Sequence, residues 1–230
     1  MVADEGSFYD RLWAERPGSP NDDERARLAE IERLLRRVLP LRGPILDVGC
    51  GTGWLAAALA AHGAVLGVDT SEEAVAQARR RFPSLDFRKV EEAAPLDEAL
   101  YALVVCSEVI EHVADQRGLM ARLARAAAPG GHVVVTTPNL KVRPYWEALD
   151  PPKQPREDWL GRKDLVSLAR DAGLRAIVSR SFFCGFTSAG RYRLCGSPRL
   201  ERIGLRGPII ALAERVGWGL YLSLLARRPA

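Results

Sequence analysis

The stretch Ile45-Leu46-Asp47-Val48-Gly49-Cys50-Gly51-Thr52-Gly53 decides the fold of this 230-residue chain. An apolar run ends in a carboxylate, three alternating glycines follow, and an Ala/Leu-rich segment begins at Trp54. Glycine adopts positive φ angles without steric cost and lets a ligand approach the backbone closely. The stretch therefore predicts a buried strand, a tight turn and a helix N-terminus, which together form the ligand crevice of a doubly wound α/β fold.

A second strand is predicted at residues 65–69, and it also ends in an acid, Asp69. Asp69 follows Gly49 at about the 20-residue spacing of a carboxylate that binds ribose hydroxyls. The simpler interpretation is that Asp69 only caps the next helix. The third glycine, Gly53, comes one residue earlier than in the G-x-G-x-x-G dinucleotide fingerprint, which argues against an NAD-type site.

Strand and helix patterns continue to alternate along the chain, which predicts one domain over residues 1–230 with a mostly parallel sheet. Helices are expected from Asp22 or Asp23 to residue 39, and later after a cap at Ser71. The other expected helices span residues 54–62, 119–127, 164–172 and 209–216. Strands are expected at residues 45–48, 65–69, 85–90, 103–106, 132–137, 174–183 and 220–226.

Composition narrows the class of protein. Hydrophobic residues make up 47% and charged residues 27% of the chain, as in a globular domain with a sizeable core. The net charge of +4 comes from arginines spread along the sequence, which argues against a nucleic-acid partner. The four cysteines have no C-x-x-C spacing, so we expect reduced thiols and a cytoplasmic location. No signal peptide or membrane-spanning run is expected.

Several later segments occur in a fixed order with the glycine stretch and Asp69. They are Val104-Val105-Cys106-Ser107-Glu108-Val109-Ile110-Glu111-His112-Val113, Pro129-Gly130-Gly131 and Thr136-Thr137-Pro138-Asn139. Over about residues 40–185 the chain resembles class I S-adenosylmethionine-dependent methyltransferases, in particular the ubiquinone-biosynthesis O-methyltransferase type. The resemblance implies a Rossmann-like seven-stranded sheet of order 3-2-1-4-5-7-6 with strand seven antiparallel.

The resemblance also implies roles in binding S-adenosylmethionine. Asp69 would accept hydrogen bonds from the ribose, Thr70 and Glu91 would lie by the adenine, and Ser107 would lie near the methyl-transfer point. Glu91 and its neighbour Glu92 could instead be solvated surface acids. The methionyl part of the cofactor would be surrounded by Asp47, Gly49, Cys50, Gly51 and Gly53.

Glu108, Glu111 and His112 would share one face if their segment were helical. In some resembling O-methyltransferases an E-x-x-E-H string holds a magnesium-like ion, so this string could bind a divalent cation. Alternatively, His112 acts as a general base, because its ordinary pKa lies near neutral pH, or it only packs. We take His112 as the catalytic candidate and assign no metal site.

The expected reaction is methyl transfer to a small molecule at oxygen, with transfer to nitrogen or to a carboxyl group as the alternatives on the same fold. A nucleotide-dependent oxidoreductase and a non-catalytic cofactor-binding module are the rivals. A helical lid is expected at residues 4–39, where Phe8, Tyr9 and Trp13 lie, and acceptor-side insertions at 139–159 and 185–207. The second insertion is basic and partly apolar, which suggests an acidic or amphiphilic acceptor or a peripheral membrane contact. This insertion could equally be a lid or a dimer surface. We expect the protein to be a monomer or a homodimer.

Overall fold

A computed structural model describes residues 5–14, 21–146, 154–183 and 198–230. Within these residues, the strands form a single sheet in the order β3-β2-β1-β4-β5-β7-β6, with β7 antiparallel to both neighbours. The predicted strand order is thus confirmed. The strands are β1 (Ile45–Val48), β2 (Val65–Asp69), β3 (Asp86–Lys89), β4 (Tyr101–Ser107), β5 (Ala127–Pro138), β6 (Arg175–Phe182) and β7 (Tyr221–Arg227).

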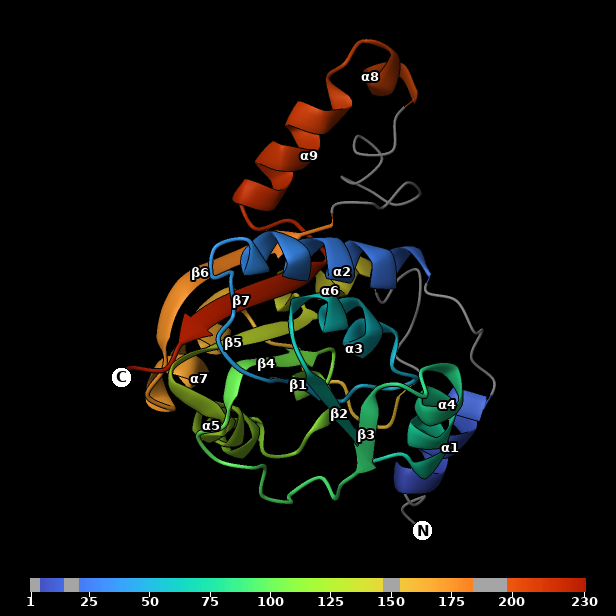
Figure 1. Cartoon of the computed structure of the whole chain (residues 1–230). Coiled ribbons are helices and arrows are strands. Elements are labelled where there is room, and N and C mark those ends of the chain that lie inside the picture. The colour runs from blue at the N-terminus through green and yellow to red at the C-terminus, as the bar shows by residue number, and fades with distance from the viewer. Residues whose placement is uncertain (1–4, 15–20, 147–153, 184–197) are drawn as a thin grey trace.

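Helices cover both faces of the sheet (Figure 1). Helices α5 and α7 pack on one face, and α2, α3 and α4 pack on the other. Because both faces are covered, the central strands β1 and β4 are apolar almost throughout. The helices are α1 (Glu5–Ala14), α2 (Asp22–Leu35), α3 (Trp54–Leu59), α4 (Glu72–Arg81), α5 (Gln116–Ala126), α6 (Arg143–Trp146), α7 (Arg162–Asp171), α8 (Pro198–Arg202) and α9 (Arg206–Arg215); the 3-10 turns are η1 (Ala60–His62), η2 (Ile110–His112) and η3 (Leu140–Val142).

Two expected helix ends differ from the structure. The cap of α2 is Asn21, one residue before the expected aspartates, and it forms a capping box with Glu24. Asp22 and Asp23 lie in the first turn, where acids favour the helix dipole. The helix ends at Leu35 rather than residue 39, and residues 36–38 form turns. Leu39 itself is disfavoured in helical conformation because it precedes Pro40. Ser71 caps α4 as predicted.

Strand β5 begins at Ala127, five residues before the expected start. Tyr101 of β4 pairs with Ala127 and Leu103 pairs with His132, so the intervening Pro129-Gly130-Gly131 forms an irregularity inside the strand. Gly130 has a φ of +78° there. The predicted turn therefore exists, but the strand resumes pairing on both sides of it.

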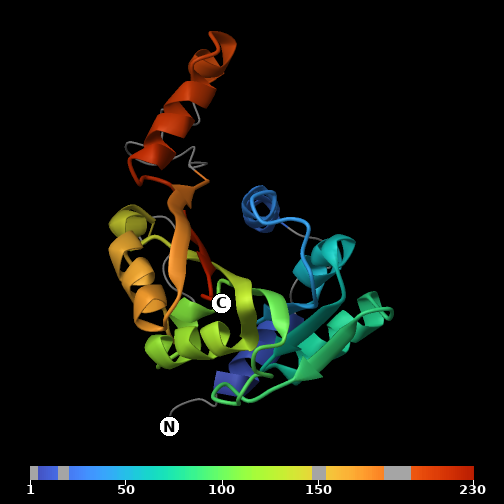
Figure 2. The same ribbon diagram turned by 60° about the vertical axis from the view of Figure 1, so that its left-hand side comes forward.

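Helices α8 and α9 project from the body beyond β6 and β7 in both ribbon views (Figures 1 and 2). The base of α9 is held by the Arg180–Glu214 ion pair at 2.6 Å and by a hydrogen bond from the Ser181 hydroxyl to the Glu214 carbonyl. Ile209 and Ile210 pack into a small apolar cluster with Phe182. No helix in the described ranges is both long enough and apolar enough to span a bilayer.

Candidate active site

Two adjoining cavities open at the carboxyl ends of β1, β2 and β4, where an α/β sheet of this kind binds ligands. The larger has a volume of about 620 Å³ and the smaller about 380 Å³. Five residues line both cavities, so the two cavities meet along one wall. These shared residues are Tyr9, Trp13, Gly49, Glu108 and His112.

The glycine loop is shaped by close packing within the protein. Gly49 and Gly51 have φ angles of +75° and +51°, which favour glycine. A Cβ on Gly49 would lie 2.1 Å from Val109, and one on Gly51 would lie 2.6 Å from the Trp13 ring. Both glycines and Cys50 line the smaller cavity, as expected for residues that approach a ligand through their backbone.

Asp47 and Gly53 lie behind this loop rather than on a cavity wall. Gly53 packs against Phe87 and Ala78. The Asp47 carboxylate is 1% exposed, and neither oxygen has a hydrogen-bond partner in the described part of the chain. Burial, with the nearby charge of Asp69, raises the pKa of Asp47 to about 7; the Ala56 amide opposes this rise.

Asp69 lines the larger cavity and is hydrogen-bonded to the glycine loop. Its Oδ2 accepts a hydrogen bond from the Gly51 amide at 2.8 Å, and its Oδ1 accepts one from the Ser71 amide at 2.9 Å. Burial raises the pKa of Asp69, while these amides oppose the rise. Each oxygen keeps a lone pair for a ligand hydroxyl. Thr70 and Glu91 line the same cavity, and Glu91 is exposed and paired with Lys89 at 3.3 Å.

Helix α1 closes over both cavities. The Ser71 hydroxyl donates to Asp10, and the Gln77 amide donates to the Trp13 carbonyl at 3.0 Å, so α1 is tied to α4. Tyr9 lies edge-on to His112, with ring centroids 6.3 Å apart. The lid expected at residues 4–39 therefore contains two helices, of which α1 contacts the glycine loop.

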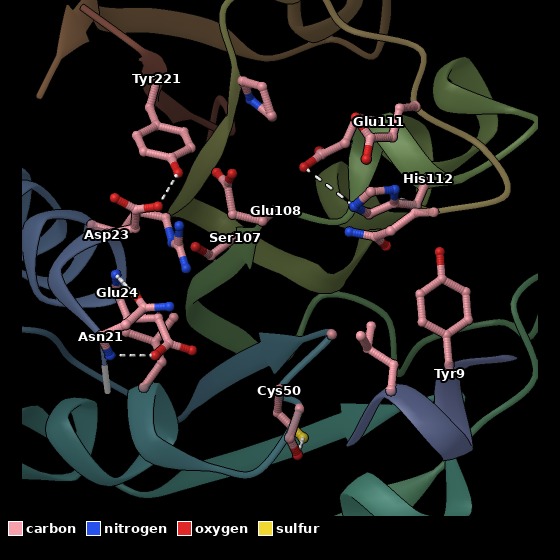
Figure 3. Close-up of a pocket in the computed structure, with 18 of the residues that line it drawn as sticks. Tyr9, Asn21, Asp23, Glu24, Cys50, Ser107, Glu108, Glu111, His112 and Tyr221 are labelled. Carbon is pink, nitrogen blue, oxygen red and sulfur yellow. Dashed lines mark hydrogen bonds and ion pairs between the residues drawn. The ribbon is translucent and has the colours of Figure 1, made fainter. Parts of the chain in front are cut away.

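Ser107 ends β4 beside the smaller cavity, and Glu108, which follows it, lies at the junction of the two cavities (Figure 3). The Ser107 and Thr136 hydroxyls are 2.8 Å apart, and Thr136 donates to Glu108 Oε1 at 2.9 Å. Glu108 has a φ of +58°, a strained conformation for a residue with a side chain. Burial raises the pKa of Glu108 to about 8, with a further contribution from Glu111.

His112 lies in the 3-10 turn η2, so the helical face considered for Glu108, Glu111 and His112 is not formed. Its Nδ1 is 2.8 Å from the Arg156 carbonyl, which can only accept; Nδ1 therefore carries a hydrogen. In the neutral ring Nε2 keeps its lone pair, 3.6 Å from Glu111 Oε1 (Figure 3). Burial raises the pKa of Glu111 to about 7.

The two carboxylates of the E-x-x-E-H string, those of Glu108 and Glu111, accept hydrogen bonds from threonine hydroxyls. Glu108 accepts from Thr136, and Glu111 accepts from Thr137 at 2.9 Å. Across the residues that the structure describes, no group of three or more His, Cys, Asp or Glu side chains is arranged to hold a metal ion.

Helix α2 contributes charged residues that the sequence analysis did not single out. Asp23, Glu24 and Arg27 line the smaller cavity, and Tyr221 of β7 faces them. Glu24 and Arg27 share the buried face of α2 with Ile31 and Leu34. Arg27 and Ile31 follow Glu24 at i+3 and i+7, so the sequence already places both charged residues on the apolar face of the helix. This spacing could have identified them, because charged residues on a buried helix face need a partner or a function.

A family profile described as a methyltransferase domain matches residues 20–179 of the chain. The chain belongs to the S-adenosylmethionine-dependent methyltransferase family. The match begins one residue before the cap of α2 and includes every residue of the glycine loop, Asp69 and His112. The family expected from the sequence, which binds S-adenosylmethionine, and its fold are thereby confirmed, and the match argues against the oxidoreductase rival.

Sequence relatives include two ubiquinone biosynthesis O-methyltransferases. That of Thiobacillus denitrificans is 38% identical over 144 residues, which cover 57% of this chain and 62% of the relative. That of Alkalilimnicola ehrlichii is 40% identical over 112 residues, or 46% of this chain and 45% of the relative. The methyltransferase thus spans about half the length of the curated relatives that it matches.

Solved structures show the same fold at low sequence identity. The N-methyltransferase NodS from Bradyrhizobium japonicum, in complex with S-adenosylhomocysteine, has a TM-score of 0.69 at 16% identity and covers 98% of this chain and 99% of its own. Phosphoethanolamine N-methyltransferase 2 of Haemonchus contortus has a TM-score of 0.67 at 17% identity, with 100% and 61% covered. These two structures are N-methyltransferases whereas the curated relatives are O-methyltransferases, so the fold alone leaves the acceptor of this chain open.

Proposed function

We propose that this methyltransferase transfers a methyl group to an oxygen atom of a small acceptor held in the 380 Å³ cavity. The observation that carries the proposal is His112 at the wall shared by the two cavities. Its Nδ1–H is occupied by the Arg156 carbonyl, which leaves the Nε2 lone pair as a base. A hydroxyl acceptor needs such a base, since its oxygen becomes an adequate nucleophile as it loses its proton.

The larger cavity suits the adenosyl part of S-adenosylmethionine. Asp69 would bind the ribose hydroxyls through its remaining lone pairs, with Thr70 and Glu91 beside the adenine. Gly49, Cys50, Gly51 and Ser107 would surround the methionyl part. Asp47 and Gly53, which lie behind the loop, would act by shaping it.

The chemical step is an in-line displacement at the methyl carbon. The acceptor O–H bond breaks and its proton moves to Nε2 of His112. The O–CH₃ bond forms as the S–CH₃ bond breaks, and S-adenosylhomocysteine leaves with the electron pair on sulfur. Glu111, 3.6 Å from Nε2, stabilises the resulting imidazolium. Alignment of the three reacting atoms contributes roughly 7–11 kcal/mol in well-positioned reactions.

Incubation with labelled S-adenosylmethionine and a small-molecule extract, followed by mass spectrometry, tests this function. We expect a product methylated at oxygen. His112→Ala should lower the rate by about 100-fold or more, the usual contribution of a general base, and leave cofactor affinity nearly unchanged. His62→Ala, at a histidine paired with Glu32 away from the cavities, is the matched control. Turnover by His112→Ala at the control rate would contradict the assignment of the base.

An amine acceptor is the second candidate, because acids outnumber cations in the smaller cavity. Five acids line it, together with Arg27 and His112; they are Asp23, Glu24, Glu108, Glu111 and Glu157. Away from Arg27, this surplus would favour a cationic ammonium group. The mass spectrum separates the candidates, since fragments of an N-methyl product differ from those of an O-methyl product. Cofactor binding without any methylated product would instead support a non-catalytic binding module.

We also propose that the arm formed by α8 and α9 contacts a membrane surface. Four large apolar side chains of the arm are between 49% and 64% exposed: Ile203, Leu205, Leu212 and Val216. Arg199, Arg202 and Arg215 are exposed on the same arm. Apolar and cationic side chains together suit an anionic lipid interface. Residues 184–197, which hold most of the basic insertion predicted at 185–207, lie outside the described residues.

A further inference from the structure

Arg27 is a buried cation on the wall of the smaller cavity. It is 8% exposed, and its guanidinium carbon lies 5.3 Å from the centroid of the Tyr221 ring. Its Nε is buried and has no hydrogen-bond partner in the described part of the chain. Burying a donor without an acceptor costs about 1–3 kcal/mol, and more for a charged group. Nε itself is closed off from solvent, and the guanidinium group that carries it belongs to a residue that lines the cavity, where this charged group can meet an anionic ligand.

The acids around Arg27 already accept hydrogen bonds from other groups. Asp23 accepts from the Tyr221 hydroxyl at 3.1 Å, and Glu24 accepts from the Asn21 amide at 2.8 Å. Glu108 accepts from Thr136. These acids act on Arg27 through their charge: burial lowers its pKa, Glu108 and the α2 acids raise it, and the net direction is upward. The guanidinium is therefore charged, and its Nε still lacks an acceptor.

Arg27 is also held in place before any ligand binds. Tyr221 supports the guanidinium through its ring and is itself fixed by Asp23 and by Phe182, whose ring centroid is 5.6 Å away. Farther along α2, Glu30 accepts from Ser223 of β7 at 2.6 Å. A positioned guanidinium binds planar oxyanions through two parallel hydrogen bonds and loses little side-chain entropy in doing so.

We propose that Arg27, supported by Tyr221, forms an anion-binding subsite that recognises a carboxylate or phosphate group of the methyl acceptor. The inference deepens the proposed function, because it rests on the smaller cavity being the acceptor site. It makes Arg27 a specificity-determining residue. Loss of Arg27 should act on acceptor binding, and so on KM, more than on kcat.

Isothermal titration calorimetry tests the subsite without knowledge of the acceptor. The full-length protein with S-adenosylhomocysteine is titrated with benzoate, phenyl phosphate and the uncharged benzamide. We expect at least one of the two anions to bind about tenfold or more tightly than benzamide, as charge-assisted hydrogen bonds predict. The tighter anion distinguishes a carboxylate from a phosphate subsite.

Two variants assign the preference to Arg27. Arg27→Gln should abolish it, and Arg27→Lys should retain only part of it, because lysine keeps the charge without the planar fork. Arg25→Gln, on the exposed side of the same helix and paired with Asp22, should leave it unchanged. Unaltered affinity for S-adenosylhomocysteine shows that each variant is folded.

Equal binding of the three probes by the unmodified protein, or an anion preference that survives in Arg27→Gln, would overturn the inference. Its failure is distinguishable from failure of the proposed function. The calorimetric preference needs no turnover, whereas the His112 variants report on methyl transfer alone. A methylated product without any anionic group would also overturn the subsite while leaving O-methylation in place.

Discussion

At the scale of single residues, the site holds acids whose protonation depends on burial. Asp47 has no hydrogen-bond partner within the described residues, and burial raises its pKa from the ordinary 3.8 to about 7. Between these two values the folded protein binds a proton that the unfolded chain has released. The free energy of unfolding therefore falls as pH rises through this window, by at most about 1.4 kcal/mol per pH unit for one group.

We expect Asp47→Asn to reduce this pH dependence. Its neutral amide has no proton to lose, so its Tm should change less between pH 5 and pH 8 than that of the unmodified protein. The pKa values of Glu108 and Glu111 are also raised, so these two groups keep part of the dependence of Tm on pH in the variant. Differential scanning calorimetry without added cofactor measures the effect, with Asp86→Asn at an exposed acid as control. An unchanged slope in Asp47→Asn would show that this carboxylate is ionised in the folded protein.

At the scale of elements, α1 borders both cavities and is held there by a few contacts. Trp13 lies on the glycine loop, and Asp10 and the Trp13 carbonyl bind α4. Trp13→Ala should raise the Kd for S-adenosylmethionine about tenfold or more, since aromatic anchors contribute on the order of 2 kcal/mol. Equilibrium binding measures this, and Arg11→Ala, exposed on the same helix, is the control. Equal affinities would remove the lid role of α1.

At the scale of the whole molecule, the arm of α8 and α9 stands apart from the catalytic body. We expect the protein to co-sediment with vesicles containing phosphatidylglycerol at low salt and to be partly released at high salt, because screening weakens the cationic contribution. Ile203→Glu with Leu212→Glu should abolish binding and preserve methyl transfer in solution.

Leu100→Glu is the matched control for the arm. Leu100 is 50% exposed on the body, close to the 61% of Leu212. The membrane proposal fails if the unmodified protein does not bind vesicles at either salt concentration, or if the control variant loses binding as the arm variant does.

Sequence patterns of only a few residues were enough to predict most of the strands and the glycine turn of this protein. Strand periodicity, the glycine turn and the acid at the end of β2 each depend on a few neighbouring residues, and the structure places Asp69, Thr70 and Glu91 in one cavity as expected. The family resemblance implied that Asp47 and Gly53 surround the cofactor, and in the structure both lie behind the loop. A residue's place in a motif does not say which way its side chain points once helices pack around it.

The sequence by itself predicted the strands, most helices and the glycine turn, because strand and helix periodicity and glycine conformations are local properties. Its resemblance to S-adenosylmethionine-dependent methyltransferases implied the sheet order, the reaction class and the cofactor. Only the tertiary structure decided the chemistry of the smaller cavity. Arg27 and Tyr221 come from opposite ends of the chain, and Glu108 reaches its threonine partner on a neighbouring strand. Burial, pKa and an unsatisfied donor arise from such distant residues meeting, so no local pattern in the sequence encodes them.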